Sequence, residues 1–120
     1  MDDARTISWI FYAVEMATGS GPADYREISS VADGINHAVP THKELQTSLT
    51  WLANAGLVSK SSGGYSLTIN GTALITESRK ESNTVMKVWA SLTQAIEHIQ
   101  KSSNPALKQN APSARPLAPR

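Results

Sequence analysis

Residues 40–67, PTHKELQTSLTWLANAGLVSKSSGGYSL, constrain the fold of this chain more than any other stretch. Thr41 is followed three residues later by Glu44, the spacing of a capping box, in which each side chain accepts a hydrogen bond from the other residue's backbone N–H. Gly56 supplies the left-handed residue that commonly ends a helix. The sequence therefore predicts a helix over residues 41–55.

A β-hairpin is predicted directly after this helix. Residues 58–60 and 65–68 have the pattern of short strands, and the small residues 61–64, Ser-Ser-Gly-Gly, lie between them. Glycine adopts the positive φ that tight hairpin turns need, so this run is suited to the turn.

The predicted helix 41–55 has one apolar and one polar side. Leu45, Leu49, Leu52 and Ala53 recur at helical spacing and are expected to face inward. The polar residues gather on the other side, near the N-terminal half. The flank between the two sides carries a tryptophan, residue 51, which is expected to pack against the helix after the hairpin or against a partner chain.

The spacing L-x-x-x-L-x-x-L-x-x-x-G-L-V from Leu45, followed by Y-x-L-T-x-x-G from Tyr65, resembles bacterial winged-helix transcription regulators of the MarR and PadR kind. The resemblance covers roughly residues 1–75. It implies a mainly α fold with a small β-hairpin wing (α+β), a winged helix-turn-helix followed by a long C-terminal helix. In PadR-like regulators the helix after the wing forms a dimer. Winged helices also dock proteins, so a protein-interaction module without DNA binding is the alternative.

In a recognition helix the outer half enters the major groove, where Lys, Gln and Thr suit base edges and phosphates. We therefore expect a regulator that binds double-stranded DNA through helix 41–55 and the hairpin. An ordinary solvated helix face has the same composition, and a protein partner at helix 41–55 is the competing interpretation. The predicted DNA-binding residues are His42, Lys43, Gln46, Thr47 and Thr50 on the helix and Lys60, Ser61, Ser62 and Gly63 on the hairpin.

Two helices are predicted before this stretch, over residues 6–17 and 22–36, from apolar residues three and four apart. The first also carries Trp9, Tyr12 and Met16 outside its main apolar stripe. A helix with so much apolar surface is expected to be covered on more than one face.

Residues 72–101 are predicted to form one long helix, or two helices with a joint near residues 82–84. Apolar residues follow alternating three- and four-residue steps, the pattern of a helix-pairing seam. Two partners remain open for this seam: the same helix of a second chain, which would make a homodimer, or helix 6–17 of its own chain. The predicted dimer residues are Val85, Trp89, Leu92, Ile96 and Ile99.

The formal net charge of +1 is unevenly distributed. Residues 1–100 contain seven Lys and Arg against all ten Asp and Glu, a net −3, whereas residues 101–120 contain four basic residues and no acid. A basic footprint, the usual mark of a nucleic-acid binder, is therefore missing from most of the chain. The predicted organisation is a winged domain over residues 1–72, a helix over 73–101, and a disordered basic tail over 102–120.

Composition and spacing also point away from several protein classes. Cysteine is absent, and His37 and His42 lie across a proline-bearing turn rather than at ligand spacing, so we expect no metal and no cofactor. No nucleophile and base occur at a recognised spacing, so the chain is predicted not to be an enzyme. No apolar run approaches the roughly 20 residues of a membrane span, and the start is acidic, so we expect a cytoplasmic protein.

Overall fold

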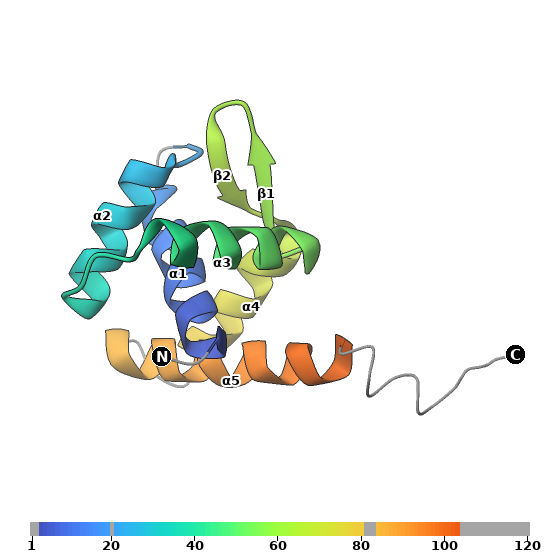
Figure 1. Cartoon of the computed structure of the whole chain (residues 1–120). Helices are drawn as coiled ribbons and strands as arrows, with labels where there is room; N and C mark the ends of the chain where they lie inside the picture. The colour runs from blue at the N-terminus through green and yellow to red at the C-terminus, as the bar shows by residue number, and fades with distance from the viewer. Residues whose placement is uncertain (1–2, 20, 81–83, 104–120) are drawn as a thin grey trace, which may run out of the picture.

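A computed structural model describes residues 3–19, 21–80 and 84–103 (Figure 1). This part of the chain forms five helices and one two-stranded antiparallel sheet, so the mainly helical α+β class is confirmed. Residues 104–120, most of the predicted tail, lie outside the described residues. The elements are α1 Asp3–Ala17, α2 Tyr25–Asn36, α3 His42–Asn54, β1 Val58–Ser61, β2 Gly64–Leu67, α4 Ile69–Arg79 and α5 Val85–Ser103.

Helix α1 lies at the centre of the fold, in contact with α2, α3, α5 and β2 (Figure 1). Every residue from Thr6 to Val14 is buried, as expected for a helix enclosed on all sides. The prediction that more than one face is covered is therefore confirmed. The indole N–H of Trp9 donates to the carbonyl of Ala32 at 2.8 Å, which ties α1 to α2.

Helices α2 and α3 begin in the same way. Thr41 and Glu44 form the predicted capping box, with N···O distances of 2.9 and 3.0 Å. Asp24 and Glu27 form a second box, so α2 starts at Tyr25 rather than at residue 22 as predicted. The Asp-x-x-Glu spacing is a local signal that a prediction based on apolar periodicity overlooks.

The predicted stop and hairpin after α3 are both confirmed. Gly56 has a left-handed φ of 79°, and β1 pairs with β2 so that Val58 faces Leu67 across the ladder. The hairpin is also fixed to the start of α2, because Ala23 and Tyr65 exchange backbone hydrogen bonds of 2.9 and 2.8 Å.

The predicted run 72–101 is divided between α4 and α5. Helix α4 begins at Ile69, three residues before the predicted start, because the hydroxyl of Thr68 caps it by accepting from the Gly71 N–H at 3.0 Å. The predicted domain boundary after residue 72 therefore falls inside a helix. Of the predicted joint, residues 82 and 83 lie outside the described part of the chain.

Helix α5 packs against α1 of the same chain, which is one of the two partners left open for the predicted seam (Figure 1). Trp89, Leu92 and Ile96 are 0% exposed within a single chain, so a second chain cannot reach them while this packing holds. Helix α1 has apolar residues on enough faces to be the partner itself. Of the other two predicted dimer residues, Val85 is 40% exposed and Ile99 is half-buried.

Candidate functional site

The outer side of α3 is polar and exposed, as predicted. Its inner side carries Leu45, Leu49 and Leu52, which are buried. Two residues differ from the prediction: Ala53 is exposed, and Ser48 is 1% exposed. Ser48 lies three residues from one buried leucine and four from another, so it belongs to the buried stripe by position although not by residue type. All five predicted contact residues of the helix are exposed: His42, Lys43, Gln46, Thr47 and Thr50.

Glu44, the single acid of α3, is held away from this outer side. Its Oε1 accepts from the backbone N–H of Thr41 at 2.9 Å, and the residue is half-buried. The exposed side of α3 therefore presents one cation, Lys43, together with uncharged groups that donate and accept hydrogen bonds. Such a surface can form hydrogen bonds with a polar partner, and it does not repel a partner that is negatively charged.

The hairpin projects above α3 in Figure 1. Its predicted contact residues Lys60, Ser61, Ser62 and Gly63 are all exposed. Lys60 is the single basic residue of the hairpin. The structure thus places the predicted residues on two elements, α3 and the hairpin.

Four side chains, here called the aromatic bridge, connect the hairpin to the first turns of α2 and α3. The Tyr25 ring stacks on Tyr65, with centroids 5.9 Å apart and planes within 4°, and meets the His42 ring edge-on at 5.8 Å. The Lys60 ammonium lies 5.9 Å from the Tyr65 centroid. The bridge therefore links His42 and Lys60, two predicted contact residues, through two tyrosines.

Tyr25 and Tyr65 were not predicted as members of the site. The two tyrosines are 40 positions apart, so no spacing pattern in the sequence links them. The pairing of Ala23 with Tyr65 brings them together in the fold. Burial, followed by a hydrogen bond with Tyr65, raises the pKa of Tyr25 above its usual value.

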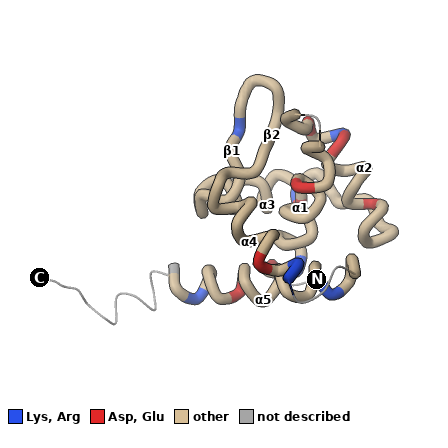
Figure 2. The backbone as a smooth tube through the Cα atoms, turned by 180° about the vertical axis from the view of Figure 1, so that it is seen from behind, with Lys and Arg blue, Asp and Glu red and all other residues tan. Residues whose placement is uncertain are grey.

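The charge around this surface is mixed (Figure 2). Residues 21–67, which include α2, α3 and the hairpin, contain three basic and four acidic residues. Asp24 lines an open hollow of about 490 Å³ together with Lys60 and the hairpin turn. General electrostatic attraction for phosphate is therefore weak here, and any nucleic-acid binding depends on the particular groups of α3.

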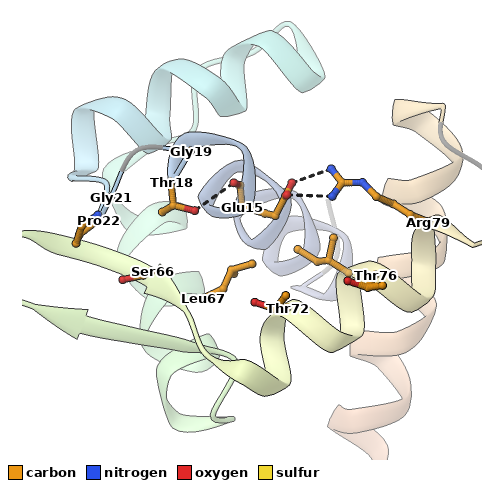
Figure 3. Close-up of a pocket in the computed structure, with 11 residues that line it drawn as sticks. Glu15, Thr18, Gly19, Gly21, Pro22, Ser66, Leu67, Thr72, Thr76 and Arg79 are labelled. Atoms are coloured by element: carbon orange, nitrogen blue, oxygen red, sulfur yellow. Dashed lines mark hydrogen bonds and ion pairs between the residues drawn. The ribbon is translucent and has the colours of Figure 1, made fainter.

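A second hollow, of about 430 Å³, lies between the end of α1, the loop after it, β2 and α4 (Figure 3). Glu15 and Arg79 close one end through two hydrogen bonds of 2.8 and 2.9 Å. The hydrogen bond with Glu15 raises the pKa of Arg79 further. The pair ties α1 to α4. Because the carboxylate neutralises the guanidinium, the hollow offers a ligand little net charge.

Within residues 3–19, 21–80 and 84–103, no group of three or more His, Asp or Glu side chains could hold a metal ion. His37, considered above as a ligand, ends α2 with a left-handed φ of 56°. No described helix is both long and apolar enough to cross a membrane.

Comparison of the chain with known protein families, with curated proteins and with solved structures finds no match.

Proposed function

We propose that the chain is a winged-helix protein that binds double-stranded DNA, with α3 as recognition helix and the β1–β2 hairpin as wing. The observation that carries the proposal is the outer side of α3. It presents five exposed polar residues, while its single carboxylate is held in the capping box. The element order, with the hairpin directly after α3, supports the winged-helix assignment.

The side chains of α3 suit the chemistry of the major groove. Glutamine can bond both edge positions of adenine, and threonine can bond either kind of base edge or contact the thymine methyl. Gln46, Thr47 and Thr50 are therefore the proposed base-reading residues. Lys43 and Lys60 are the proposed phosphate contacts, one on the helix and one on the wing.

With so few cations, binding is expected to be weak at physiological salt. Each neutralised phosphate contributes about 0.9 to the slope of log affinity against log salt, so Lys43 and Lys60 supply a slope of about 2 per chain. Lys108, Arg115 and Arg120 lie outside the described residues but carry three more charges. Truncation after residue 103 is therefore expected to flatten the slope by up to about 3 units.

The test is a binding assay at low salt against a random pool of duplexes, followed by selection of preferred sequences. Replacing Gln46, Thr47 and Thr50 together with alanine should abolish sequence preference and leave the salt slope unchanged. A matched control replaces one glutamine and two threonines elsewhere, Gln94, Thr72 and Thr76, which are equally exposed on α4 and α5. If the full chain shifts no duplex at low salt, the proposal is wrong.

A protein-docking surface is the second candidate, because residues 21–67 have more acids than bases. Asp24 and Glu27 lie at the start of α2, where Ala23 joins the hairpin. A partner with basic side chains would complement this edge. This candidate predicts that the chain without residues 104–120 binds no duplex at low salt, whereas the DNA proposal predicts that it does.

A further inference from the structure

A cavity of about 250 Å³ lies between the start of α1, helix α3 and the end of α5. Trp51 of α3 and Gln100 of α5 line this cavity, and both residues are half-buried. The other two tryptophans, Trp9 and Trp89, are at most 2% exposed and belong to the core. Trp51 is therefore the tryptophan that a further segment of protein can still cover.

The end of α5 brings one such segment close to the cavity. Gln100 lies in the last turn of α5, which ends at Ser103. The chain beyond this helix, residues 104–120, contains two large apolar residues, Leu107 and Leu117. Leu107 follows Ser103 by four residues, and four residues of extended chain span at most roughly 14 Å. Leu107 is thus the apolar side chain with the shortest tether to the cavity.

The charges of the cavity and of this segment are complementary. Two acids and one base line the cavity, Asp3 and Glu44 against Lys43. Residues 101–120 carry four basic residues and no acid, and one of them, Lys108, directly follows the leucine. Such an attraction near the surface is weak and is screened by salt, so it orients the segment rather than holding it.

We propose that residues 104–108, Asn-Pro-Ala-Leu-Lys, fold back from the end of α5 and dock in this cavity. The Leu107 side chain lies against the Trp51 ring, and the Lys108 ammonium lies toward Asp3. Covering the two apolar groups removes them from water, which is the driving force for docking. Because the tether is only a few residues long, the entropy cost of closing it is small.

Pro105 favours this change of direction. Proline lacks a backbone N–H and disfavours a helical conformation at the residue before it, so α5 is not expected to continue through this point. A short tether also gives the segment an effective concentration in the millimolar range, so it reaches the cavity before the tail of a second molecule at micromolar concentration. Docking would cover the cavity beside Thr47, a proposed base-reading residue, but it does not depend on DNA binding.

The test compares Leu107→Ala with Leu117→Ala in the full chain. Both variants make the same change in the same tail and keep every charge, but only the first alters the proposed segment. The readout is the NMR spectrum, in which the three tryptophan indole N–H groups give separate signals. Leu107→Ala should shift the signal of Trp51 and leave those of Trp9 and Trp89, which are hydrogen-bonded in the core, unchanged. Leu117→Ala should shift none of the three.

A peptide of residues 102–112, added to the Leu107→Ala chain, provides the second arm. It should return the Trp51 signal toward its position in the unchanged chain, with half-saturation at roughly 1 mM. The same peptide with alanine in place of Leu107 should not. In the unchanged chain, nuclear Overhauser effects should join the Leu107 methyl groups to the Trp51 ring.

Three results would each overturn the proposal. The first is a Trp51 signal that is the same in Leu107→Ala as in the unchanged chain. The second is an equal shift in Leu117→Ala, which would mean that any loss of apolar surface in the tail has this effect. The third is a Trp51 signal that changes with protein concentration over about a hundredfold range, since the cavity would then be occupied by a second molecule.

Discussion

Trp89→Ala is expected to destabilise the fold of the single chain rather than dissociate a dimer. Trp89 is 0% exposed, and its ring centroid lies 6.4 Å from that of Trp9. Its indole N–H donates to the Arg5 carbonyl and to Ser8 Oγ, each at 3.1 Å. The Arg5 guanidinium lies 3.9 Å from the ring centroid. Truncation removes all of these contacts between α1 and α5.

The expected loss is a large part of the total stability. A buried aromatic side chain hides roughly 150–250 Å² from water, which at about 25 cal/mol per Å² corresponds to roughly 4–6 kcal/mol. Measured truncations of large aromatic residues in cores give about 3–5 kcal/mol. Because small domains have only about 5–15 kcal/mol in all, the variant should be marginally folded. Trp89→Phe keeps a ring in place and should lose only about 1–3 kcal/mol, the cost of the missing N–H donor.

The measurement is urea unfolding followed by circular dichroism, at two protein concentrations that differ by about a hundredfold. Packing within one chain predicts the same midpoint at both concentrations, since no second molecule takes part. Trp51→Ala is the control, because Trp51 is half-buried and should lose less stability. A midpoint that rises with concentration, or a dimer that Trp89→Ala converts into folded monomers, would refute the assignment of α5 to the core of one chain.

Three further predictions test other parts of the fold. The raised pKa of Tyr25 means that folding favours the neutral phenol. The stability that this contributes is fully present below about pH 10, the usual tyrosine pKa, and is lost as the pH rises through the folded pKa. Urea midpoints measured across this range should show the fall, and Tyr25→Phe should flatten it. Gly71→Ala would drive its new methyl group into the backbone before β1 and should lower the melting temperature, whereas Gly34→Ala, in open space within α2, should raise stability by about 0.5–1 kcal/mol. Glu15→Gln should cost at most about 1 kcal/mol by thermal unfolding, because the Arg79 side chain is 40% exposed and water screens the pair.

The sequence by itself determined the elements whose signals are local. The capping box of Thr41 and Glu44 sets the start of α3, and Gly56 sets its end. Both the capping box and the glycine involve residues within one turn of a helix end, so they can be recognised in the sequence without knowledge of the rest of the fold. The same holds for the hairpin and for the polar outer side of α3.

Only the tertiary structure decided which surfaces meet. The apolar seam of α5 shows that a face must be covered, but the hydrophobic effect is non-directional, so the pattern cannot distinguish α1 from a second chain. The stacking of Tyr25 on Tyr65 and the cavity beside Trp51 likewise depend on which elements pack against each other. Each joins residues that are distant in the sequence, and only the packing of the chain brings them together.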